Sequence, residues 1–157
     1  MSYHKQILDG TAAIIEAIVP LTDNEPNKRF KRLNRQTIEE AEDQPSGHRM
    51  FSVKWSDGFA IRPFTGQYEQ MVIERGIDIT IVYRIQDRAE REIEPVIMED
   101  ADQIGWALTN PVNRLSLTGA EFISYIETMN NQVTPSESGG SLLLTITVPI
   151  LYRSSKY

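Results

Sequence analysis

The chain has 157 residues, of which 40% are apolar and 24% are charged, so we expect a single globular domain spanning residues 1–157. It contains no cysteine, which excludes disulfides, thiol nucleophiles and metal sites built on cysteine. No apolar run approaches the length of a membrane-spanning helix, and the first residues lack the pattern of a signal peptide, so we expect neither.

The formal net charge is −6, and most of it lies in one stretch. Residues 86–102 hold seven acidic and two basic side chains, a net charge of −5. This excess of acid argues against binding to a nucleic-acid backbone, although it allows a protein through which DNA passes without being held. Contiguous acids are typical of a solvated face, whereas metal ligands converge from separate elements, so we predict an acidic surface here.

Residues 3–19 predict the first helix. Ile7, Ile14 and Ile18 fall on one stripe of helical period, Ser2 is a suitable N-cap, and Pro20 ends the run.

Residues 21–48 predict a long mobile polar loop. Their basic side chains precede the acidic ones, which is the unfavourable order for a helix dipole, so we expect at most a marginal helix there. Loops of this length inside a compact domain are usually functional or disordered.

Alternating apolar residues predict strands at 49–55 and 76–85, with irregular chain over 60–70 and a second strand start within 67–74. A helix is predicted over 96–110 from the stripe Ile97, Ala101, Ile104 and Leu108.

The last third of the chain predicts short strands at 114–117 and 121–127, a polar loop at 130–141 and a long strand at 141–152. Pro149 lacks an N–H, so we expect this strand at the sheet edge, or its proline nitrogen turned away from a partner. The order helix, strands, helix, strands predicts an α+β fold. Two principal helices would pack on one face of a mainly antiparallel sheet, with long polar loops.

Motifs that carry chemistry are missing from the sequence. It has two histidines, no Gly-x-Ser-x-Gly, no phosphate-binding glycine loop and no calcium loop. We therefore predict no catalytic residue, no metal and no cofactor, and do not expect an enzyme. Trp106 lies off the apolar stripe of its helix, which leaves it either exposed or covered by a neighbouring loop. Exposed aromatics are enriched at interfaces, and we favour four side chains for partner contacts: Phe30, Arg32, Arg35 and Trp106.

The order of elements resembles that of the tail terminator proteins (tail-completion or neck proteins) of long-tailed bacteriophages. The resemblance runs through the helix Lys5–Val19, the strand ending Ile79-Thr80-Ile81-Val82-Tyr83-Arg84, the helix Asp100–Leu108 and the closing strand Leu142–Tyr152. It covers most of the chain and consists of order and pattern rather than a single motif.

This resemblance implies a homohexameric ring at the neck of a virion, assembled in the host cytoplasm. Such a ring caps the tail tube protein, ends tube polymerisation and offers a joining surface to the head-completion or connector protein. DNA is present only in transit through the lumen, and no membrane is involved. Glu90, Glu92 and Glu94 are the acids that we expect to line that lumen.

Three other functions stay open from the sequence. The chain could be another head–tail connector or head-completion subunit. It could be a metal-dependent hydrolase that uses the acidic stretch, which would then gain stability from divalent ions. It could also be a small monomeric module whose residues 21–48 fold on a partner protein.

Overall fold

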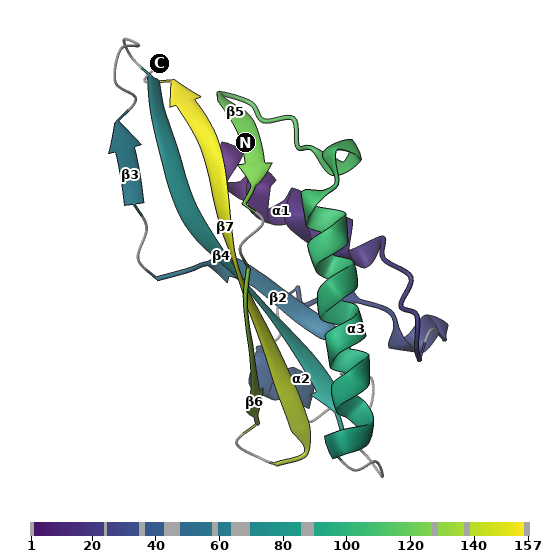
Figure 1. The fold of residues 1–157 in the computed structure, drawn as a ribbon. Coiled ribbons are helices and arrows are strands. Elements are labelled where there is room, and N and C mark those ends of the chain that lie inside the picture. The colour runs from purple at the N-terminus through teal and green to yellow at the C-terminus, as the bar shows by residue number, and fades with distance from the viewer. Residues whose placement is uncertain are drawn as a thin grey trace.

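The computed structural model describes residues 2–23, 25–34, 37–42, 48–57, 60–63, 70–85, 90–126, 129–136 and 139–155. Its elements, in chain order, are α1 (Tyr3–Glu16), η1 (Pro26–Lys28), β1 (Lys31–Arg32), α2 (Ile38–Glu42), β2 (Met50–Trp55), β3 (Ala60–Pro63), β4 (Gln70–Arg84), α3 (Glu90–Thr109), η2 (Pro111–Asn113), β5 (Ala120–Tyr125), β6 (Asn130–Pro135) and β7 (Ser141–Ser155) (Figure 1).

One seven-stranded sheet organises the chain. Its strand order is β1-β2-β4-β7-β5, while β3 pairs with β4 and β6 pairs with β7. The two 15-residue strands β4 and β7 form an antiparallel ladder from Gln70↔Ser155 to Arg84↔Ser141. The only parallel pairing among the described strands joins β1 to β2, so the fold is α+β with a mainly antiparallel sheet, as predicted.

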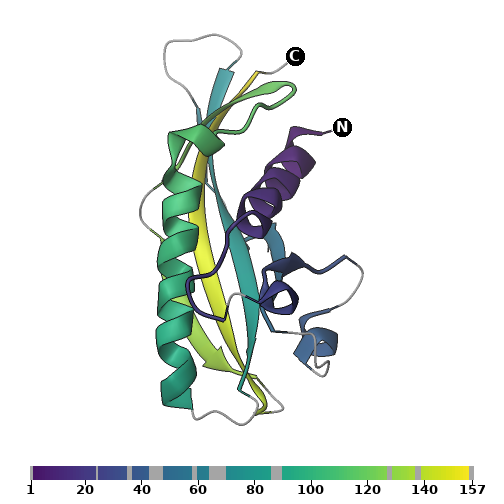
Figure 2. The ribbon, with the colours of Figure 1, turned by 90° about the vertical axis from the view of Figure 1, so that its right-hand side faces the viewer.

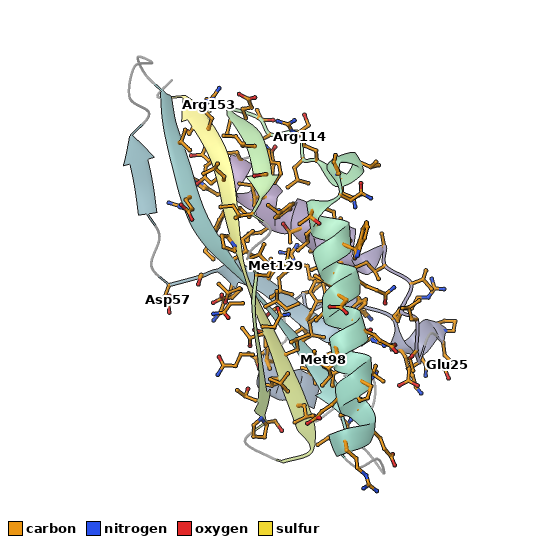
Figure 3. All side chains as sticks on the ribbon, viewed as in Figure 1. Glu25, Asp57, Met98, Arg114, Met129 and Arg153 are labelled. Carbon is orange, nitrogen blue, oxygen red and sulfur yellow. The ribbon has the colours of Figure 1, made fainter. Side chains whose placement is uncertain are left out.

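Both long helices lie against the same face of this sheet (Figure 2). Alternation along β4 and β7 points a row of aliphatic side chains at them, which explains the single large core. Side chains fill the layer between α3 and the strands (Figure 3). The short helix α2 instead packs in a smaller cluster with Leu33, Met50 and Val82. Met50 and Val82 alternate along their strands with side chains of the large core, so this cluster lies on the opposite face of the sheet.

The first helix begins as predicted and ends earlier. The Ser2 hydroxyl accepts from the Lys5 N–H at 3.5 Å, and the helix closes at Glu16 with Ala17 as its C-cap. The second long helix begins at Glu90, six residues before its predicted start. Ile93 is fully buried and extends the apolar stripe toward the N-terminus, although Pro95 interrupts the backbone hydrogen bonding of that turn.

The described part of residues 21–48 holds more regular structure than the predicted polar loop with at most a marginal helix. This part contains η1, β1 and the short helix α2, which is the marginal helix that the sequence allowed. Phe30 and Leu33 are buried, so apolar contacts with the sheet outweigh the unfavourable order of charges. Residues 24, 35–36 and 43–47 lie outside the described part, and mobility of the segment stays a prediction.

Two stretches expected to be irregular are strands, and one expected strand is not. Residues 60–63 form β3, and the polar residues 130–135 form β6, which pairs with β7 as a hairpin. Residues 114–117 form no strand. Residues 70–84 are one continuous strand rather than two. Polar sequences such as β6 carry no period-2 apolar signal, because neither side of an exposed strand needs to be apolar.

Pro149 lies in the central strand β7, so the expectation of an edge strand is wrong. The alternative expectation, a proline nitrogen turned away from a partner, fits the structure. The Pro149 carbonyl oxygen accepts from the Ile126 N–H at 2.9 Å, so its nitrogen also faces the side of β5 and β6. The ladder with β5 ends at Ile150 and the ladder with β6 begins at Thr147. The missing donor therefore falls in the gap between two partner strands, where no ladder bond is lost.

Candidate interaction surface

A buried cation and a buried anion tie α3 to the sheet. Arg49 and Asp100 are both fully buried, and the Arg49 Nε and Nη2 atoms lie 2.6 and 3.0 Å from the two carboxylate oxygens of Asp100. The Tyr83 hydroxyl donates to the same carboxylate at 2.7 Å. Burial raises the pKa of Asp100 against the opposing effect of Arg49, and burial together with Asp100 raises the pKa of Tyr83 well above its usual value.

The remaining donors of Arg49 hold the chain that follows α1. They reach the backbone carbonyls of Thr22 at 2.7 Å, Lys28 at 3.1 Å and Asp23, so all five guanidinium donors are used. Arg49 itself has a left-handed backbone with φ 61°, a conformation that costs a residue with a side chain of order 1 kcal/mol. Its bonds within the cluster offset that cost. The cluster therefore has a structural role: it ties α3 and the segment after α1 to the residue that precedes β2.

A second set of bonds fastens the same segment to the surface of α3. The Gln103 amide donates to the Val19 carbonyl at 3.0 Å and accepts from the Leu21 N–H at 3.3 Å. The Thr22 hydroxyl donates to Glu99 at 2.7 Å. Val19 and Leu21 are thus held beside α3 while their side chains stay 50% and 70% exposed.

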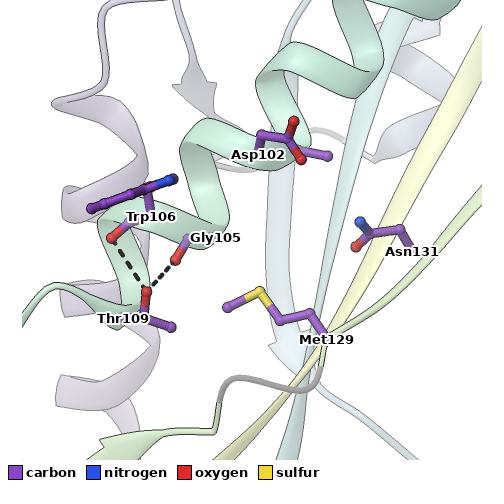
Figure 4. A pocket seen from close by; sticks show the side chains of 7 residues that line it. Asp102, Gly105, Trp106, Thr109, Met129 and Asn131 are labelled. Carbon is purple, nitrogen blue, oxygen red and sulfur yellow. Dashed lines mark hydrogen bonds between the residues drawn. The ribbon is translucent and has the colours of Figure 1, made fainter.

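Trp106 projects from α3 between two surface hollows, and we call this region the Trp106 surface. The indole is 77% exposed. The first hollow, of about 490 Å³, lies between α3 and the start of β6 (Figure 4). Its lining residues are Ala101, Asp102, Gly105, Trp106, Thr109, Met129 and Asn131. The second, of about 520 Å³, lies between α3 and the held segment with Val19 and Leu21. An exposed tryptophan on a fixed support is typical of a protein contact.

The residues that the sequence favoured for partner contacts do not form one site. Phe30 is buried beside Phe51 with the Arg49 guanidinium 5.6 Å from its ring centre, so a contact through Phe30 is wrong for the folded chain. The Arg32 guanidinium lies 2.7 Å from the Asp9 carboxylate on α1. Arg35 lies outside the described residues. Trp106 is exposed, which decides between the two alternatives for its side chain.

The three predicted lumen acids occupy the first turns of α3. Glu92 and Glu94 are exposed there, and nothing is described of the Glu90 side chain. Among the described residues, no group of three or more acids and histidines could hold a metal ion. No described helix combines the length and apolarity needed to cross a membrane.

No protein-family model matches this chain, and no curated protein matches it significantly.

Proposed function

We propose that this chain is a structural virion subunit that forms a ring at the end of a phage tail tube. The ring ends tube polymerisation and offers the head-joining surface, while DNA passes through its lumen. The Trp106 surface carries the proposal. It combines an exposed indole with two hollows on a support that Arg49, Asp100 and Gln103 hold in place, as a subunit contact requires.

Two further observations support this function. The order α1, β4, α3, β7 keeps the pattern through which the sequence resembles tail terminators. Three of the fully buried polar residues, Arg49, Asp100 and Tyr83, bond to one another and, through Arg49, to backbone carbonyls. A ring subunit needs surfaces rather than a reactive group, and a head-to-tail ring needs two different surfaces on each copy.

Tube length in the presence of the chain tests the proposal. Purified tail tube protein from the same virion is polymerised alone and with the chain, and tube lengths are measured by negative-stain electron microscopy. We expect short tubes with the chain at one end, and long tubes with the Trp106→Ala variant. Lys54→Ala, an exposed change on the opposite face of the sheet, is the matched control. Unchanged tube lengths and bare tube ends with the native chain would contradict the proposal.

A monomeric protein-binding module is the second candidate, because a partner protein could also cover the Trp106 surface. This candidate predicts a mass near 17.9 kDa at every concentration and no effect on tube length. Ring assembly with tube capping and a persistent monomer are mutually exclusive outcomes, so the two functions separate in one series of measurements.

A further inference from the structure

The outer edge of β6 is a row of backbone hydrogen-bonding groups without a partner strand in the part of the chain that the structure describes. The Ser136 N–H donates to the Ser141 carbonyl at 2.9 Å, which sets the alternation of the β6–β7 ladder. Thr134 and Gln132, two and four residues back, therefore turn their backbone groups toward β7, and Val133 and Asn131 turn theirs outward. No described strand pairs with that outer edge.

Proline closes one end of this row. Pro135 follows Val133 at the next outward position and has no N–H to offer. The edge thus presents two complete residues, Asn131 and Val133, for pairing with another chain. Free edges of this kind are the sites at which proteins add an extended peptide as a further strand.

The side chains of Asn131 and Val133, whose backbone groups face the outer edge, lie on the same side of the sheet as α3. Val133 pairs with Leu144, which points into the core under the helices, and the Val133 side chain is 43% exposed. The hollow between α3 and β6 lies at the same place (Figure 4). The space beside Gly105 is open, since a methyl group built there would meet only the Met129 sulfur, at an ordinary contact distance of 3.8 Å. An added strand would have room for a side chain against Trp106 and Met129.

The acidic side chains of α3 near β6 favour a basic segment as the added strand. Glu94, Met98 and Asp102 follow one another at four-residue spacing along exposed α3, and neither acid makes an ion pair with a described residue. Arg91 is the one base on the described surface of α3. Pairing with β6 of a second copy would place two acidic α3 helices near each other, and a nucleic acid would place phosphates near these acids. Both partners are therefore repelled by like charge.

We propose that the outer edge of β6 binds an extended basic segment of a partner protein as an added strand. Its backbone pairs with Asn131 and Val133. On the side of α3, one apolar side chain enters the hollow beside Trp106, and flanking lysine or arginine side chains face Glu94 and Asp102. The inference rests on the proposed function only in taking the Trp106 surface as a protein contact. A peptide experiment can fail while tube capping succeeds, and the reverse also holds.

The test uses a capped synthetic peptide in which a lysine, a valine and a second lysine are separated by single threonines. The two lysines and the valine then share one face of a strand. Hydrogen exchange of single amides is followed by NMR with and without saturating peptide at low salt. We expect exchange at Asn131 and Val133 to slow by about tenfold or more, and the fluorescence of Trp106 to shift to shorter wavelength in a Trp55→Phe background. A peptide with glutamate in place of lysine is the charge control.

Val133→Pro and Val133→Ala form the matched pair of variants. Proline replaces the valine side chain and removes an outward donor without removing a bond to β7, whereas alanine keeps that donor and shortens the same side chain. The β6–β7 hairpin is checked through the protection of the Gln132 amide. We expect proline to abolish peptide binding and alanine to retain it. Unchanged exchange at Asn131 and Val133, equal binding by both variants, or equal binding of the glutamate peptide would each overturn the proposal.

Discussion

The Arg49–Asp100–Tyr83 cluster lies on the buried side of α3 and the Trp106 surface on its exposed side, and the two regions treat charge and apolar area in opposite ways. In the cluster, charged groups are fully buried and every guanidinium donor has an acceptor. On the surface, a large apolar side chain is 77% exposed and contacts solvent. Buried charge must be paired, and exposed apolar area is most useful when a partner covers it.

The difference separates what folds the chain from what the chain can do. The cluster fixes where α3 and the segment after α1 lie, and that placement produces the hollows on either side of Trp106. Changes in the cluster should therefore reduce stability, and changes on the surface should reduce assembly at nearly constant stability.

The largest effect is expected from Asp100→Asn. The change keeps the shape of the side chain and removes the counter-ion of Arg49, which leaves an uncompensated buried charge. Removing one partner of a buried ion pair costs about 3–5 kcal/mol. Urea unfolding measures the loss, and Asp102→Asn on the exposed side of α3 is the control, with an expected change within about 0.5 kcal/mol. Equal losses in both variants would remove the contrast.

Alkaline pH tests a second buried polar pair. The Tyr125 hydroxyl lies 2.6 Å from the Thr11 hydroxyl, and burial raises the pKa of Tyr125 to about 12. The unfolded chain ionises this tyrosine near pH 10. The contribution of Tyr125 to the free energy of unfolding is therefore fully present below pH 10 and is lost as the pH rises toward 12. A shift of this size corresponds to about 2–3 kcal/mol.

The Tyr125→Phe variant isolates that effect. Burial also raises the pKa of Tyr152 to about 12, so both proteins should lose stability between pH 10 and 12. The native chain should lose more of its free energy of unfolding than the variant, as measured by urea unfolding at a series of pH values. Parallel pH profiles for the two proteins would show that Tyr125 ionises normally in the folded state.

Gln103→Ala gives an intermediate case at the boundary between the two regions. It removes two bonds to the segment with Val19 and Leu21, and we expect a loss of about 1 kcal/mol. The sharper measurement is hydrogen exchange at the Leu21 amide, whose acceptor disappears, so that exchange should become faster. Protection at the buried strands should stay unchanged. An unaltered Leu21 amide would mean that Arg49 and the Thr22–Glu99 bond hold the segment without Gln103.

Trp106→Ala should have the smallest effect on stability, within about 0.5 kcal/mol, because so much of the side chain is already in water. The same variant should lose self-assembly, measured as the mass in light scattering coupled to size exclusion. A large loss of stability with assembly intact would place Trp106 among the residues that fold the chain.

The sequence predicts well what depends on local periodicity. Alternation predicted β7 and most of β4, and a helical stripe predicted α1 and the body of α3. It also singled out Trp106, because that residue falls off the stripe. The start of α3 was missed since Pro95 hides the continuation of the stripe to Ile93.

Pairings between distant residues were beyond the reach of the sequence. Arg49 and Asp100 are 51 positions apart, and each reads as an ordinary surface charge. β6 carries no apolar alternation because its side chains are largely exposed, so only its register with β7 identifies it as a strand. Phe30 was misjudged for a related reason, since its burial depends on Phe51 and Arg49 from another strand region.

The native mass in solution shows whether this chain is a self-assembling subunit. We would measure it by light scattering coupled to size exclusion at low salt, with negative-stain images of the peak. We expect annular particles of about 107 kDa, six copies of a 17.9 kDa chain. A particle of about 18 kDa at every concentration, unchanged when tail tube protein is added, would contradict this expectation.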